Sequence, residues 1–168
     1  MKMCYYVVSI LKISILLLYE GGNMTCTFFG SRDTNINKIE VPLLKTLVNL
    51  IENDKVDTFY VGNQGNFDYA VQKQLNKLQK FYPHIKYSIA LAYLPKEKSD
   101  FHKIDFSNSF LPEGVEKGPI KFAIDRRNRW LINNSDYVVT CVRSPIGGAA
   151  KYKALAEKKG KIVIDICL

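Results

Sequence analysis

The chain has 168 residues and a formal net charge of +8 at pH 7, with 47% hydrophobic and 24% charged residues. This length fits one domain with a substantial core, and this balance excludes an intrinsically disordered chain. Four cysteines without a CxxC pair and only two histidines, His84 and His102, argue against a zinc site and against a disulfide framework.

The first 23 residues have a basic start and an apolar middle, as in a signal peptide or a membrane anchor. Lys12 interrupts the apolar run, and no small-x-small cleavage site follows it. Residues 20–24 can be encoded by a purine-rich ribosome-binding sequence followed by a start codon. We therefore predict that translation begins at Met24, that residues 1–23 are a mis-assigned extension or an apolar leader, and that 24–168 form a single domain. An N-terminal peptide from upstream of Met24, found by mass spectrometry of the native protein, would contradict this.

From residue 25 onward, short apolar runs alternate with amphipathic segments, which predicts five strands separated mostly by helices. The predicted strands are 25–30, 57–62, 86–95, 136–142 and 161–168. The predicted helices are 37–54, 67–83, 118–135 and 147–160. Pro42 is tolerable only in the first turn of the first helix, and the polar segment 96–118 is predicted to be a loop that folds over a site. The alternation implies parallel pairing, and hence an α/β three-layer sandwich around a mostly parallel five-stranded sheet.

Three of the predicted strands end in loops rich in glycine or small polar residues. Parallel pairing brings the carboxyl ends of the strands to one edge of the sheet, where ligands bind in such folds. Glycine lets the backbone approach a phosphate, and the following helix offers free N–H groups. The spacing matches neither the GxGxxG fingerprint nor the P-loop. The predicted phosphate- or ligand-binding residues of these loops are Gly30, Ser31, Arg32, Gly62, Asn63, Gly65, Gly147, Gly148 and Ala149.

Two further side chains are candidates for ligand binding, and for catalysis if the protein is an enzyme. Asp68 begins the second predicted helix, where its carboxylate either caps free N–H groups or bonds ribose hydroxyls. Arg127 has apolar helical neighbours, and since an unpaired buried guanidinium is costly, we favour a functional role for it. Trp130 either stacks a nucleotide base beside the neighbouring arginines or lies half buried under a basic outer face.

The positive charge is concentrated between Lys117 and Lys161, a segment that contains eleven Lys or Arg residues and only three acidic residues. The remainder of the chain has thirteen basic and thirteen acidic residues. This bias favours an anionic partner, either a phosphorylated small molecule or a nucleic acid. For the lysines at 158, 159 and 161, a solvated helical face is the better interpretation.

The apolar runs contain Cys26, Cys141 and Cys167, and we expect these cysteines to be reduced, small core residues. This pattern suits the cytoplasm of a bacterium or a phage host. The sequence predicts neither a metal site nor a bound cofactor.

Five stretches carry a resemblance to a known family: FFGSRDT, TFYVGNQGNFDYAV, FYPHIKYSIALAYLP, FAIDRRNRWLINNSDYVV and GGAAKYKALAEKKGK. They resemble the SLOG superfamily of Rossmann-like nucleotide-binding proteins, and within it the YpsA- and YoqJ-like branch. The similarity covers essentially residues 24–168. It implies a nucleotide-derived ligand held by the loops after the first, second and fourth predicted strands.

The Lonely Guy phosphoribohydrolases of that superfamily cleave the base from a nucleoside monophosphate. Their motifs are Arg-Lys-x-x-Met on a helix and Pro-Gly-Gly-x-Gly-Thr-x-x-Glu in a loop. Arg127 matches the motif arginine, and Gly147 and Gly148 match the paired glycines. Ala154 stands where the catalytic glutamate belongs, so the same activity would require another carboxylate. The candidates for it are Asp33, Asp68 and Glu116.

The sequence thus favours a module that binds a nucleotide or a nucleotide-derived phosphoribosyl ligand, as a sensor or by sequestering it. The alternative from another class is an N-glycosidic, phosphoribohydrolase-like hydrolase with a relocated catalytic carboxylate. Single-stranded nucleic-acid binding is a weaker alternative. We expect a nucleotide-derived small molecule as the partner, leave a homo-oligomer open, and expect no membrane association.

Overall fold

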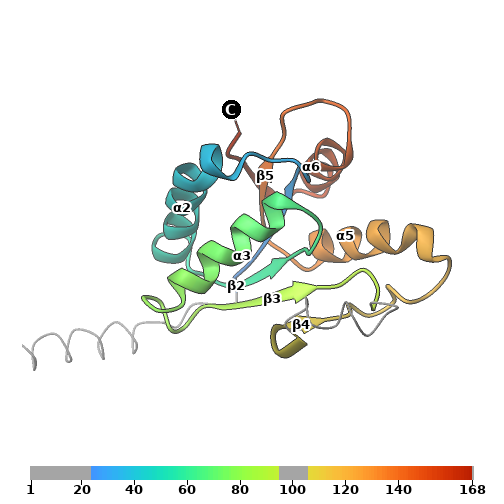
Figure 1. Ribbon diagram of the computed structural model, residues 1–168, viewed down its shortest axis with the longest axis horizontal. Helices are drawn as coiled ribbons and strands as arrows, with labels where there is room; N and C mark the ends of the chain where they lie inside the picture. Colours follow the sequence, from blue (N-terminus) through green and yellow to red (C-terminus); the bar gives the residue numbers. More distant parts are fainter. Residues whose placement is uncertain (1–23, 95–105, 168) are drawn as a thin grey trace, which may run out of the picture.

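Six parallel strands form one sheet in the computed structural model, which describes residues 24–94 and 106–167 (Figure 1). The strands are β1 (Met24–Gly30), β2 (Val56–Val61), β3 (Lys86–Ala90), β4 (Ser109–Phe110), β5 (Tyr137–Cys141) and β6 (Ile162–Asp165). Their order in the sheet is β4-β3-β2-β1-β5-β6, and each neighbouring pair is parallel. The predicted α/β sandwich with a parallel sheet is confirmed. The predicted extension at residues 1–23 lies outside the described residues.

The strand that the sequence analysis missed is β4, so the sheet has six strands rather than five. β4 lies inside the segment predicted as a loop and contributes two residues, which pair with Ile89 and Ala90 of β3. A strand this short contains no alternation of apolar and polar residues, and periodicity is the signal by which a strand is found in a sequence.

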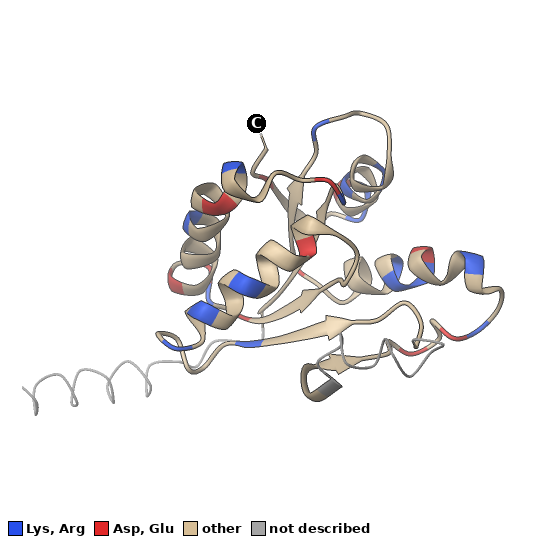
Figure 2. Ribbon diagram, in the orientation of Figure 1, with Lys and Arg blue, Asp and Glu red and all other residues tan. Residues whose placement is uncertain are grey.

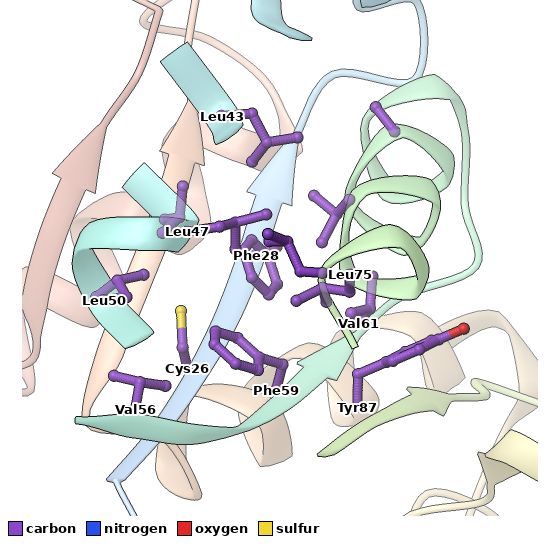
Figure 3. Packing of buried hydrophobic residues seen from close by; sticks show 14 of the residues in the cluster. Cys26, Phe28, Leu43, Leu47, Leu50, Val56, Phe59, Val61, Leu75 and Tyr87 are labelled. Carbon is purple, nitrogen blue, oxygen red and sulfur yellow. The ribbon is translucent and has the colours of Figure 1, made fainter. Parts of the chain in front are cut away.

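Two pairs of helices cover the two faces of the sheet (Figure 1). The helices are α2 (Ile36–Glu52), α3 (Asn66–Leu78), α5 (Ala123–Asn133) and α6 (Gly148–Lys158). Successive residues of β1 point to opposite faces: Phe28 packs with the residues of α2 and α3, whereas Phe29 packs with those of α5 and α6. Figure 3 shows the first of these cores, in which Phe28 lies between Leu47 of α2 and Leu75 of α3, and Phe59 lies near Cys26.

The first predicted helix was placed wrongly with respect to its proline. Pro42 is the seventh residue of α2 rather than part of its first turn. It deprives the carbonyl of Lys38 of an intrahelical partner. The helix nevertheless continues, because Leu43, Leu47 and Leu50 behind the proline are completely buried against the sheet. Tertiary packing here outweighs the local preference of one residue.

Of the three cysteines expected to be reduced core residues, one is a free thiol and two form a disulfide. Cys26 is free and fully buried, and burial raises the pKa of its thiol, so it remains protonated and unreactive. Cys141 and Cys167, however, form a disulfide, with Cα atoms 4.7 Å apart. The prediction of reduced thiols at these two positions was wrong because β6 runs beside β5, which brings the C-terminal residues next to the end of β5.

The chain order reverses between β1 and β5, the two central neighbours of the sheet. Strands β2, β3 and β4 extend from β1 to one side, and β5 and β6 extend to the other. In open α/β sheets, the crevice outside the carboxyl ends of the strands at such a switch point is the usual position of a ligand. Gly30 and Cys141, which are register partners, end the two strands there. Among the described helices, none has the length and apolar character needed to cross a bilayer.

Candidate functional site

A cavity of about 440 Å³ opens at the carboxyl edge of the sheet, at the switch point beside β1. Loops after β1 and β2, the first turns of α3 and α6, and one side of α5 contribute to its lining. The cavity brings together most of the residues that the sequence analysis selected. These are Gly30, Ser31, Arg32, Gly62, Asp68, Arg127, Gly148 and Ala149.

Three selected residues, Asn63, Gly65 and Gly147, do not line the cavity. Gly65 has a φ of +104°, and a Cβ on it would lie 2.5 Å from the Cα of Arg32. This glycine therefore allows the loop after β2 to pack against the loop after β1, where the N–H of Asn66 donates to the Arg32 carbonyl at 2.9 Å. Gly147 is the residue before α6. Gly65 and Gly147 thus lie in the loops next to the cavity and do not contribute to its lining.

Two buried ionisable side chains of the cavity lining lie close together beside Gly62. Arg127 is 2% exposed and Asp68 is 8% exposed. Arg127 Nη1 donates to the carbonyl of Ala90 at 3.1 Å, and Asp68 Oδ2 accepts the N–H of Gln64 at 2.8 Å. A Cβ on Gly62 would lie 2.3 Å from Asp68 Oδ2 and 2.5 Å from Arg127 Nη1, so both groups converge on the bare Cα of Gly62.

One N–H donor of the Arg127 guanidinium has no acceptor among the described residues. Its Nε is fully buried and has no hydrogen-bond partner among the described residues. A buried donor without an acceptor costs about 1–3 kcal/mol. The arginine nevertheless lies in the lining of a cavity large enough for a ligand that would supply an acceptor.

Burial raises the pKa of Asp68 to about 6, against the opposing effects of the Arg127 charge, the Gln64 N–H and the Arg32 charge. Burial also lowers the pKa of Arg127, against the opposing charge of Asp68. Asp68 therefore titrates near neutral pH, where a carboxyl group can both hold and release a proton. Its hydrogen bond goes back to the loop at Gln64 rather than to the helix, so helix capping does not account for its position.

Sequence reasoning missed several lining residues, namely Phe28, Gln64, Ile124, Asn128, Leu131, Lys151 and Tyr152. Lys151 and Tyr152 follow the glycine pair by one helical turn, and this spacing places them on the side of α6 that Gly148 presents to the cavity. The i, i+4 relation to the selected glycines was the available signal. Leu131 follows in the same way, since it is the i+4 neighbour of Arg127 on α5, whereas Asn128 is the i+1 neighbour of Arg127 and the i, i+4 relation does not predict its position.

The carboxylates proposed from the sequence as substitutes for a glutamate at position 154 differ in whether they line the cavity. Ala154 itself is exposed on α6 and does not line the cavity. Asp33 and Glu116 are also exposed and lie outside the lining. Asp68 is the carboxylate that the structure places in the cavity among the described lining residues.

Trp130 lies outside this cavity. Its ring packs edge-on against Tyr60 and Phe110, with centroids 5.4 Å away in each case, and it is partly buried. Its neighbour Arg126 donates from Nε to the carbonyl of Val115 at 2.9 Å. Lys and Arg occur on all four helices (Figure 2). The interpretation of Trp130 as a half-buried side chain of α5 agrees with this packing.

Within residues 24–94 and 106–167, no group of three or more His, Cys, Asp or Glu side chains is arranged to hold a metal ion.

A family model described as the YspA SLOG family, YpsA, matches residues 21–162. No curated protein matches the chain. DNA processing protein A (DprA) from Streptococcus pneumoniae has a TM-score of 0.61 at 16% sequence identity, over 85% of this chain and 50% of that chain. TarJ from S. aureus, in complex with NADPH, has a TM-score of 0.41 at 16% identity, over 76% of this chain and 43% of that chain. The chain therefore spans about half the length of the solved chains it matches.

The likeness to DprA shows a shared fold, in agreement with the Rossmann-like architecture that the resemblance implied. The family model covers nearly all of the described strands and helices, including every residue of the cavity lining. The chain belongs to the YpsA SLOG family.

Proposed function

We propose that the protein binds a nucleotide or a nucleotide-derived phosphoribosyl ligand in the cavity at the switch point, as a sensor or by sequestering the ligand. The observation that carries the proposal is the buried guanidinium of Arg127, whose Nε lacks an acceptor among the described residues. A planar guanidinium with a free N–H is well matched to a phosphate or ribose oxygen.

The rest of the lining offers both groups that attract an anion and an apolar surface. Gly148 and Ala149 begin α6, whose first N–H groups have no intrahelical partner and form the positive end of the helix dipole. Arg32 and Lys151 add two cations to the lining. The apolar surface comes from Phe28, Ile124 and Leu131. The volume lies within the range of about 300–1,000 Å³ that is usual for small-molecule sites.

Titration calorimetry with AMP, ADP-ribose and adenosine tests the proposal. We expect both phosphorylated ligands to bind and adenosine to bind much more weakly, because the cations and the helix N-terminus act on the phosphate. Absence of binding by every phosphorylated nucleotide at millimolar concentration would contradict it. A cytoplasmic location, in keeping with a soluble metabolite as ligand, is part of the same proposal, although the disulfide between Cys141 and Cys167 removes the support that reduced cysteines were expected to give it.

An N-glycosidic hydrolase is the second candidate, and the position of Asp68 favours it. A carboxyl group whose pKa is raised to about 6 is suited to donate a proton to a leaving base, and Asp68 lines the cavity. In this case the rate is constant below pH 6 and falls about tenfold per pH unit above it, because only the protonated acid is active.

Chromatographic measurement of free base, released from a panel of nucleotides between pH 5 and pH 9, checks this prediction. Asp68→Asn should lower the rate by about a hundredfold or more, while calorimetry still detects the ligand. A rate that rises with pH through the same range excludes Asp68 as the acid. Complete absence of free base from every nucleotide leaves the binding module as the function.

Nucleic-acid binding is a weaker candidate. DprA, which shares the fold, is a DNA processing protein, and the basic bias of residues 117–161 would suit a phosphate backbone. Binding of oligonucleotides that weakens steeply with salt would support it, whereas no binding at low salt would exclude it.

A further inference from the structure

Asp125 lies in the first turn of α5, next to the cavity but outside its lining. Its Oδ1 accepts hydrogen bonds from the ammonium of Lys151 at 2.5 Å and from the hydroxyl of Tyr152 at 2.9 Å. Its Oδ2 accepts the Nε–H of Arg129 at 2.6 Å. Lys151 and Tyr152 both line the cavity, so one carboxylate on α5 holds two lining side chains of α6.

Of these two side chains of α6, Tyr152 is packed tightly and Lys151 is not. Tyr152 is buried, and its ring stacks on Phe29 with centroids 5.3 Å apart, so packing fixes it independently of Asp125. The side chain of Lys151 is 54% exposed, and its ion pair with Asp125 lies at the surface. Exposed ion pairs of this kind contribute little net free energy. Lys151 can therefore leave Asp125 at small cost, whereas Tyr152 cannot leave its place.

The cavity offers Lys151 another partner once an anion is bound. Gly148 and Ala149 line the cavity at the start of α6, and the N–H of Lys151 donates to the carbonyl of Gly147 at 3.0 Å. Arg127, whose Nε has no hydrogen-bond partner in the described part of the chain, belongs to the same lining. A phosphate dianion between these donors carries more charge and more acceptor oxygens than a carboxylate. It would attract the Lys151 ammonium more strongly than Asp125 does.

We propose that Asp125 is an internal counter-anion of the site, which pairs with Lys151 in the empty cavity and releases it to the phosphate group of a bound nucleotide. The inference rests on the proposed nucleotide-binding function and adds a rule of specificity to it. A dianionic phosphate outcompetes the carboxylate for Lys151, whereas a singly charged ligand does so poorly. Asp125 is thus a positioning residue that sets the charge a ligand needs.

The variant Asp125→Asn tests this directly, because the amide keeps an oxygen acceptor for the Tyr152 hydroxyl and removes the charge. We expect its affinity for AMP, measured by titration calorimetry at low ionic strength, to rise about three- to fivefold. The gain should vanish in the double variant Asp125→Asn/Lys151→Gln. The preference for AMP, a dianion, over the singly charged cyclic AMP should also decrease in Asp125→Asn.

Glu157→Gln is the matched control. Glu157 is an exposed acid near the other end of α6, outside the cavity lining, and its replacement changes the net charge by the same amount. We expect it to change the affinity less than about twofold, since distant surface charges are screened.

A carboxylate that serves only to tie α5 to α6 predicts the opposite sign, with binding weakened in proportion to the loss of thermal stability. That result overturns the proposal, as does a gain that persists without Lys151 or is matched by Glu157→Gln. If the wild-type protein binds AMP and Asp125→Asn binds it equally well, this inference alone fails. If neither binds any phosphorylated nucleotide, the proposed function fails and this inference fails with it.

Discussion

Replacing Arg127 by methionine is expected to lower the affinity for AMP by at least about thirtyfold, because removing one partner of a buried charged contact costs about 2–5 kcal/mol. Methionine is unbranched and fills a similar volume, but it offers no donor. Arg127→Lys keeps the charge and loses the planar fork, so we expect an intermediate loss of about tenfold. Titration calorimetry with the same nucleotide measures both.

The matched control for this prediction is Arg126→Met on the same helix. Arg126 bonds the carbonyls of Val115 and Pro119 rather than lining the cavity. It carries the same charge, so its replacement alters the overall field equally and should leave the affinity for AMP nearly unchanged. Thermal unfolding of each variant separates lost binding from lost folding. Equal affinities of the wild-type and Arg127→Met proteins would refute the assignment of Arg127 as the main ligand donor.

The second large effect concerns stability. The disulfide between Cys141 and Cys167 closes a loop between residues that are 26 positions apart. Constraining a loop of that length in the unfolded chain stabilises the native state by about 3.5 kcal/mol. Addition of a thiol reductant should therefore lower the free energy of unfolding of the wild-type protein by roughly that amount, measured by urea denaturation.

Cys167→Ala should show the lower stability without reductant and should not respond to reductant at all. The Cys26→Ala variant is the control, because Cys26 is buried and free, and its response to reductant should equal that of the wild-type protein. A wild-type denaturation midpoint that is identical with and without reductant would contradict the prediction.

The sequence predicted the sheet and its loops well because both depend on signals within a few neighbouring residues. Apolar runs ended by glycine placed Gly30 and Gly62 at strand ends, and the parallel rule brought them to one edge. The buried position of Arg127 followed from its apolar neighbours on the helix. In each case the pattern of a short segment already contained the information.

What escaped prediction depends on pairs of residues that are distant in the chain. The contact of Asp125 with Lys151 spans 26 positions, and so does the disulfide. Neither contact produces a periodic pattern in the sequence. The first forms only because α5 and α6 lie side by side, and the second only because β5 and β6 do. β4 was missed for a different reason, since its two residues are too few to show a period.

Gly62 has a consequence for other members of the family. Its bare Cα lies where a methyl group would overlap both the Asp68 carboxylate and the Arg127 guanidinium, and each of these groups is already fixed by a backbone bond to Gln64 or Ala90. A related chain with alanine or any larger residue at the equivalent of position 62 cannot hold both buried charges in this arrangement. The identity of one strand-end residue therefore distinguishes relatives that keep this acid–guanidinium pair from those that must recognise their ligand by other means.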